Sequence, residues 1–165
     1  IESLQGKKIV QAACGAEHSI ALTSDGKLFA WGWGRYGNLG NGDFVDCCEP
    51  TGVIGLDGKT VVKTACGWRH TLAVTDAGEL FAFGWNKYGQ LGMGDDEQFR
   101  TRPHRVERLS DRKITVISGG WRHSMAADEH GKLFAWGWGK FGQLGIGSSK
   151  DQNAPQLVEA LSSEK

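Results

Sequence analysis

The six residues Cys66-Gly67-Trp68-Arg69-His70-Thr71 decide how the rest of the chain is organised. They return as Gly119-Gly120-Trp121-Arg122-His123-Ser124, and an earlier version reads Cys14-Gly15-Ala16-Glu17-His18-Ser19. The histidines of the three versions lie 52 and then 53 residues apart. A motif that returns at such a period is typical of proteins built from repeated structural units. We therefore predict a single segment over residues 1–165 made of three units, 1–58, 59–111 and 112–165.

A second repeated stretch predicts how the units pack together. It reads Leu28-Phe29-Ala30-Trp31-Gly32-Trp33 in the first unit, and residues 80–85 and 133–138 are its copies. Side chains alternate between the two faces of a strand, so one face is aromatic and the other carries Leu, Ala and Gly. A bulky face can fill the space beside the small face of the next sheet, as in a β-propeller. We predict an all-β propeller of four-stranded blades, with mainly core roles for the strand tryptophans Trp31, Trp33, Trp85, Trp136 and Trp138.

Each unit continues with a glycine-rich loop, at residues 37–42, 89–94 and 142–147. Such loops can bind phosphate, but no helical pattern and no Lys-Ser/Thr pair follows these three. We predict instead that the glycines serve turns with positive φ and close backbone approaches.

A proline begins the last predicted strand of each unit, over residues 50–54, 103–109 and 155–161. If this strand joins the sheet of the following unit, the first blade lacks a strand and the last strand is spare. Three blades are also fewer than the usual four to eight. The chain is therefore either a segment of a larger, seven-bladed ring or half of a ring that a second copy completes by exchanging this strand.

Composition excludes several classes of partner. The 165 residues contain 19 Lys and Arg against 19 Asp and Glu, which argues against a broad surface for nucleic acid or membrane. No apolar run reaches the roughly 18 residues of a membrane span. The four cysteines do not recur in every unit, so we expect small, buried, reduced thiols, with no metal and no cofactor. Because the sequence does not begin with Met, we expect it to be part of a longer chain.

The two positions before each repeated histidine change their chemistry between units. They hold Glu17 after an alanine in the first unit, and the pairs Trp68-Arg69 and Trp121-Arg122 in the others. Blades of a ring present equivalent loops side by side, so the two tryptophans should be neighbours, each beside an arginine. These residues either form an interface or simply cover the face of the ring. The opposite charges would suit a salt-sensitive contact with another copy.

The repeated histidines His18, His70 and His123 follow the scaffold, so we expect buried hydrogen-bonding roles for them. No nucleophile, base and carboxylate recur beside them. We therefore predict that the protein is not an enzyme.

The whole chain resembles the regulator-of-chromosome-condensation repeat, through Gly-x-x-His-Thr/Ser, Asp-Gly-Lys-Leu-Phe-Ala-Trp-Gly and Gly-Gln-Leu-Gly-x-Gly. That resemblance implies a seven-bladed propeller. Within this family, the order Ala-Glu, Trp-Arg, Trp-Arg is similar to three central blades of the plant UV-B photoreceptors.

The resemblance to the photoreceptors implies roles for named residues. Trp121 matches the principal light-sensing tryptophan and Trp68 its excitonic partner, whereas Arg122, Arg69 and Glu17 match residues of a salt-bridged homodimer interface. It also implies a cytoplasmic and nuclear location and an E3 ubiquitin ligase partner, bound through a tail that these 165 residues do not contain. A further Trp-Arg-His repeat of the photoreceptors would lie in the next blade.

These observations leave two candidate functions. The first is UV-B perception through intrinsic tryptophans at a homodimer interface that light weakens. The second is a protein-interaction propeller of the same superfamily, either a scaffold or a guanine-nucleotide exchange factor for a small GTPase. A light-dependent change of mass would separate them.

Overall fold

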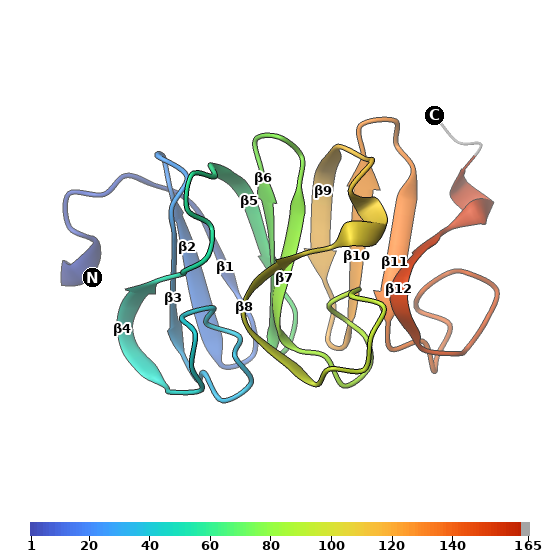
Figure 1. The fold of residues 1–165 in the computed structure, drawn as a ribbon, viewed down its shortest axis with the longest axis horizontal. Helices are drawn as coiled ribbons and strands as arrows, with labels where there is room; N and C mark the ends of the chain where they lie inside the picture. The colour runs from blue at the N-terminus through green and yellow to red at the C-terminus, as the bar shows by residue number, and fades with distance from the viewer. Residues whose placement is uncertain (163–165) are drawn as a thin grey trace.

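The computed structural model describes residues 1–162 as three four-stranded antiparallel sheets, which lie side by side (Figure 1). Blade 1 contains β1 (Ile9–Cys14), β2 (His18–Thr23), β3 (Leu28–Gly32) and β4 (Cys47–Gly52). Blade 2 contains β5 (Val61–Cys66), β6 (His70–Thr75), β7 (Leu80–Trp85) and β8 (Phe99–Arg105). Blade 3 contains β9 (Ile114–Gly119), β10 (His123–Asp128), β11 (Leu133–Gly137) and β12 (Gln152–Leu157).

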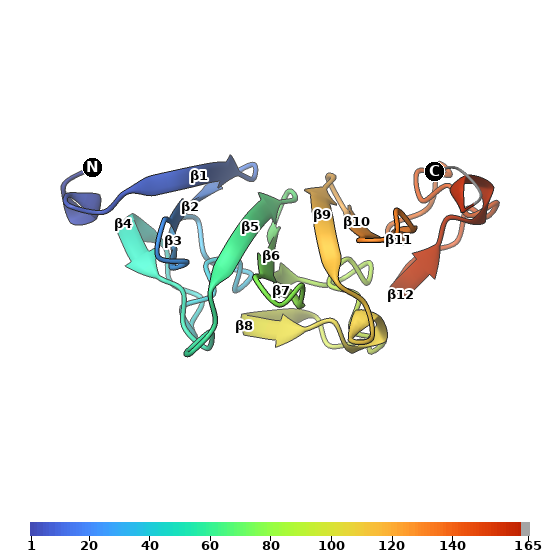
Figure 2. The same ribbon diagram turned by 90° about the horizontal axis from the view of Figure 1, so that it is seen from above.

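The sheets fan out like the blades of a propeller, with β1, β5 and β9 along one side of the fan (Figure 2). Three short 3-10 helices, η1 (Glu2–Leu4), η2 (Glu107–Leu109) and η3 (Glu159–Leu161), lie outside the sheets. Within residues 1–162, no helix is long and apolar enough to cross a membrane. The structure thus confirms the predicted all-β propeller architecture.

The predicted position of the proline strands was wrong. Each blade takes all four strands from one unit, because β4, β8 and β12 pair with β3, β7 and β11 of their own units. Pro50, Pro103 and Pro155 lie inside these strands, at an edge of the sheet where a missing N–H costs no ladder bond. The residues expected at the strand ends instead form η2 and η3.

This pairing also removes the reason for strand exchange between two copies. Blade 1 already has its fourth strand in β4, and β12 already lies in blade 3. A ring completed by a swapped strand is therefore not supported, because within residues 1–162 no blade lacks a strand and no strand lies outside a blade.

The predicted packing of a small face on an aromatic face is confirmed at both blade junctions. Leu28 and Ala30 of blade 1 share a core cluster with Phe81 and Phe83 of blade 2. Leu80 and Ala82 of blade 2 share another with Phe134 and Trp136 of blade 3. Phe83 and Trp136 are fully buried as a result, whereas their counterpart in blade 1, Trp31, is only partly buried.

Two loop glycines explain why the glycine pattern recurs. Gly40 has φ +67°, and a Cβ there would lie 2.7 Å from the ring of Phe83 in blade 2. Gly92 has φ +75°, and a Cβ would lie 2.8 Å from Nε1 of Trp136 in blade 3. Each loop thus bends back over the aromatic residue of the next blade, which agrees with the structural role predicted for these glycines.

Two of the three repeated histidines hydrogen-bond from one blade to the next. His18 Nε2 lies 3.0 Å from Thr71 Oγ1, and His70 Nε2 lies 2.8 Å from Ser124 Oγ. The Thr71 hydroxyl donates its only proton to the Asn38 carbonyl, at 3.0 Å, so it must accept from an N–H at His18 Nε2. Burial lowers the pKa of His18 to about 4 and that of His70 to about 3. Both imidazoles are therefore neutral at pH 7, which agrees with the buried hydrogen-bonding role expected for them. The same expectation was wrong for His123, which is only partly buried and whose side chain has no hydrogen-bond partner among residues 1–162.

The cysteines are free thiols, but they are not buried as expected. Cys14 and Cys48 are exposed, and Cys47 and Cys66 are partly buried.

Candidate functional site

The variable positions of the three units come together at one end of the inner strands. They lie in the loops that follow β1, β5 and β9, and the backbone links these loops from blade to blade. Ala16 N–H donates to the Trp68 carbonyl, and Trp68 N–H donates to the Trp121 carbonyl, each at 3.2 Å. These two hydrogen bonds place equivalent loop residues of neighbouring blades side by side.

Trp68 and Trp121 are neighbours, as the repeat predicted. Their ring centroids are 5.2 Å apart, with an angle of 54° between the planes. Trp68 is partly buried, whereas 53% of Trp121 is exposed to solvent. The pair is thus a contact between two indoles of which one opens onto the surface.

Arg69 stacks on the first indole and is neutralised within the chain. Its guanidinium carbon lies 4.0 Å from the ring centroid of Trp68. Its Nη2 lies 3.4 Å from a carboxylate oxygen of Glu17, the residue at the equivalent position of blade 1. Glu17, which the sequence suggested would meet another copy, therefore pairs with an arginine of its own chain.

Arg122 stacks on the second indole without such a carboxylate. Its guanidinium carbon lies 4.3 Å from the ring centroid of Trp121 and 5.2 Å from that of Trp68. Among residues 1–162 it forms no ion pair, and its buried Nε has no hydrogen-bond partner. The guanidinium thus carries an uncompensated positive charge, half-buried among aromatic rings.

A second layer of tryptophans lies directly behind the indole pair. The Trp68 centroid is 5.7 Å from that of Trp85, and the Trp121 centroid is 6.1 Å from that of Trp138. The backbone N–H groups of Trp33, Trp85 and Trp138 donate to the carbonyls of the charged residues Glu17, Arg69 and Arg122. Trp85 is buried, but Trp33 and Trp138 are only partly so, and all three belong to the site rather than to the packing between blades alone.

The sequence reading missed this layer because strand alternation assigned it to the same face as the core aromatics. The pairing of β6 with β7 explains why the second tryptophan layer lies beside the arginines. His70 lies opposite Gly84, so the residues next to them, Arg69 and Trp85, also face each other.

Two tyrosines complete the site, and the sequence reading missed these as well. Arg69 Nη1 donates to the Tyr36 hydroxyl and Arg122 Nη1 to the Tyr88 hydroxyl, each at 3.0 Å. Each tyrosine belongs to the loop of the preceding blade. Only the repeated Lys/Arg-Tyr/Phe-Gly pattern marked them, and that pattern lacks strand periodicity.

The site is rich in aromatic rings and guanidinium groups and contains no nucleophile–base pair. It can absorb near-ultraviolet light, because indole does so without any bound group. It can also bind an anion, because Arg122 has no carboxylate partner within residues 1–162.

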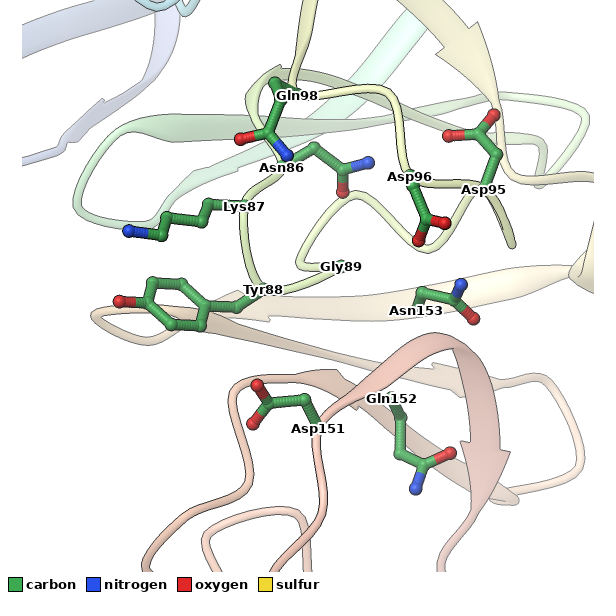
Figure 3. Close-up of a pocket in the computed structure, with 10 residues that line it drawn as sticks. All are labelled: Asn86, Lys87, Tyr88, Gly89, Asp95, Asp96, Gln98, Asp151, Gln152 and Asn153. Carbon is green, nitrogen blue, oxygen red and sulfur yellow. The ribbon is translucent and has the colours of Figure 1, made fainter.

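An acidic cleft of about 350 Å³ between the outer loops of blades 2 and 3 is a weaker candidate (Figure 3). Two of its three carboxylates already have partners, since Asp95 pairs with Arg100 and Asp151 accepts from the Gly139 N–H. Over the described part of the chain, no three His, Cys, Asp or Glu side chains are placed to hold a metal ion.

Comparison with known proteins gives consistent matches over the full chain. A family model described as the RCC1-like domain matches residues 1–165. The chain is 50% identical over 165 residues to the Ultraviolet-B receptor UVR8 of Arabidopsis thaliana, covering 100% of this chain and 37% of that protein. It is 38% identical over 162 residues to the E3 ubiquitin-protein ligase HERC2 of Homo sapiens, covering 97% of this chain and 3% of that protein. The chain thus spans little more than a third of UVR8.

Solved structures give the same fold. Human WBSCR16 superposes with a TM-score of 0.84 at 26% identity, over 94% of this chain and 41% of that one. Prp20p of Saccharomyces cerevisiae superposes with a TM-score of 0.83 at 23% identity, over 91% of this chain and 38% of that one.

Proposed function

Since the chain belongs to the RCC1-like domain family, we propose that it perceives UV-B light through the indoles of Trp68 and Trp121. The observation that carries this proposal is the indole pair itself, 5.2 Å between centroids, with an arginine stacked on each ring. The 50% identity to a UV-B receptor over the whole chain supports it. No bound chromophore is required.

The neighbouring arginines would convert absorption into a change of association. A guanidinium over an indole is held by the negative face of the ring. Excitation redistributes the charge of the indole, so the attraction to Arg122 changes, and with it any contact that Arg122 makes. Exposed Trp121 and uncompensated Arg122 suit a two-fold homodimer in which the partner offers a carboxylate. Light would weaken that homodimer.

The identity to the receptor also motivates two further proposals. We expect a cytoplasmic and nuclear location and an E3 ubiquitin ligase as the downstream partner. Localisation of a tagged chain would test the first. Because the tail that the resemblance assigns to the ligase contact lies outside these 165 residues, the second requires capture by the ligase, before and after illumination, of a polypeptide that includes such a tail.

The test is the mass of the 165-residue chain by gel filtration with light scattering, before and after UV-B. We expect wild type to lose mass on illumination, Trp121→Phe to be unresponsive and Trp68→Phe to respond partly. Trp136→Phe is the matched control, because Trp136 is fully buried in β11 and its Nε1 donates to the Gln90 carbonyl, away from both arginines. A normal response of Trp121→Phe would contradict the assignment.

The second candidate is a protein-interaction propeller, for which the 38% identity to HERC2 is the supporting observation. The similarities point to a non-catalytic protein, and a scaffold or a guanine-nucleotide exchange factor for a small GTPase fits this group. If the protein is a scaffold, illumination should not change the mass of its assembly in wild type or in any variant. Exchange activity would appear as accelerated nucleotide release from a small GTPase in the dark.

A further inference from the structure

The hydroxyl groups of Tyr36 and Tyr88 each reach an arginine of the following blade. Tyr88 lies in the loop after β7, and its hydroxyl accepts from Arg122 Nη1 at 3.0 Å. Tyr36 holds the same position in blade 1 and accepts from Arg69 Nη1 at 3.0 Å. The third unit carries Phe141 there, without a hydroxyl. The chain therefore contains this tyrosine–arginine contact twice, and its third unit has a phenylalanine that cannot form it.

The two arginines depend on their tyrosines to different degrees. Arg69 also contacts Glu17 at 3.4 Å, so it has a second directional partner. For Arg122, the Tyr88 hydroxyl is the one hydrogen-bond acceptor that residues 1–162 supply. Loss of the hydroxyl should therefore free Arg122 but not Arg69.

Aromatic rings alone hold a guanidinium without orienting it. Arg122 lies 4.3 to 5.2 Å from the centroids of Trp121, Tyr88, Trp138 and Trp68, so it is attracted from several sides at once. Such attraction depends weakly on rotation, whereas a hydrogen bond is directional. The hydroxyl is thus the group that can select one orientation.

Tyr88 is itself held rigidly enough to do so. Its backbone N–H donates to the side-chain oxygen of fully buried Gln90 at 2.9 Å. Its ring packs edge-on against Trp85, with centroids 5.4 Å apart. Figure 3 shows its hydroxyl pointing away from Asp96 and Asn153 of the acidic cleft, so the cleft does not compete for it.

We propose that Tyr88 is a positioning residue, whose hydroxyl fixes the Arg122 guanidinium over Trp121 and so sets how strongly the indole couples to that cation. The effect on light perception rests on the proposed function. The orientation of Arg122 does not, and can be measured in the dark.

The test compares Tyr88→Phe with two matched controls on the full 165-residue chain. Tyr36→Phe removes the equivalent hydroxyl beside Arg69, which keeps Glu17. Phe141→Tyr adds a hydroxyl where residues 1–162 offer no arginine. The dark readouts are the nitrogen NMR signals of the guanidinium groups, which resolve when rotation is hindered, and the near-ultraviolet circular dichroism of the Trp68–Trp121 pair.

In Tyr88→Phe we expect the separate Nη signals of Arg122 to merge and the dichroism to change, with both retained in the two controls. Unchanged Arg122 signals in Tyr88→Phe would overturn the positioning role, whatever the response to light. If wild type responds to UV-B, Tyr88→Phe should respond with a lower yield than either control, because the cation beside the excited indole is no longer held in one orientation. A wild type without any response would remove the proposed function and leave the dark test decisive for Tyr88.

Discussion

Equivalent positions in a repeat need not have equivalent electrostatics. Arg69 and Arg122 occupy the same place in consecutive blades and stack on equivalent tryptophans. Arg69 is paired with Glu17, and the pair adds little net charge to the surface. Arg122 contributes its full charge, because residues 1–162 supply no carboxylate to it. We therefore expect Arg122, rather than Arg69, to contact a partner.

This difference leads to a prediction about salt. Arg122→Ala should weaken self-association of the chain in the dark and remove most of its dependence on ionic strength, because the contact that salt screens is lost. Arg69→Ala should have a smaller effect, since its charge is already neutralised. Sedimentation at low and high salt measures both. Association that persists unchanged in Arg122→Ala and in high salt would rule out an electrostatic contact at this residue.

The sequence alone could identify the indole pair and its arginines, because they vary at fixed positions in a constant scaffold. It could not identify the tyrosines or the pairing of Glu17 with Arg69. Those contacts cross from one blade to the next, and their geometry depends on how far neighbouring sheets are rotated, which no periodicity encodes.

At the scale of elements, hydrogen bonds near their first residues connect the strands β2, β6 and β10 of neighbouring blades. His18 and His70 bond hydroxyls at the second positions of the following strands, β6 and β10. The boundaries of these strands were predictable from the repeated histidine and the hairpin turn. The partner of the proline strands was not, because β4 and β8 each lie between two sheets in the chain and either sheet offers an edge.

The buried histidines make stability depend on pH. Their native pKa values of about 4 and about 3 lie below the usual 6.5, so only the unfolded chain binds protons between these values. The contribution of the two histidines to the free energy of unfolding is therefore fully present well above pH 6.5. As the pH is lowered below 6.5, the free energy of unfolding should fall by about 1.4 kcal/mol per pH unit for each histidine.

Urea titrations between pH 7.5 and 5 measure this slope. His70→Gln keeps a donor at the same place and should reduce the slope, whereas His104→Gln, at an exposed position of β8, is the control and should not. An unchanged slope in His70→Gln would mean that other groups control the acid sensitivity.

At the scale of the whole molecule, the two end blades carry the two halves of the interface that occurs twice inside the chain. Blade 1 presents the partly buried aromatic face of Phe29 and Trp31. Blade 3 presents the partly buried residues Leu133, Met125 and Ile146, which cover the fully buried Ala135. Apolar faces of this kind favour association.

We therefore expect the 165-residue polypeptide to associate also through its end faces, by blade packing and without strand exchange. Trp31→Glu should weaken this association, and because the contact is apolar, added salt should not. Val45→Glu, at an exposed loop position, is the control. Light scattering at micromolar concentration measures the mass of the assembly in wild type and in both variants. A wild-type polypeptide that stays monomeric in the dark would contradict both this contact and the Arg122 contact.

The histidine bonds have a consequence for how such a chain can change in length. His18 meets Thr71 and His70 meets Ser124, so each unit carries a donor for its successor and an acceptor for its predecessor. A gene duplication or deletion of one whole period therefore brings matched surfaces together at the new junction. The same bond forms at both junctions although the histidines lie 52 and then 53 residues apart, so the loops absorb small differences in length. A duplication or deletion that cut through the strands would instead separate donor from acceptor, so the whole unit is the increment that preserves this bond.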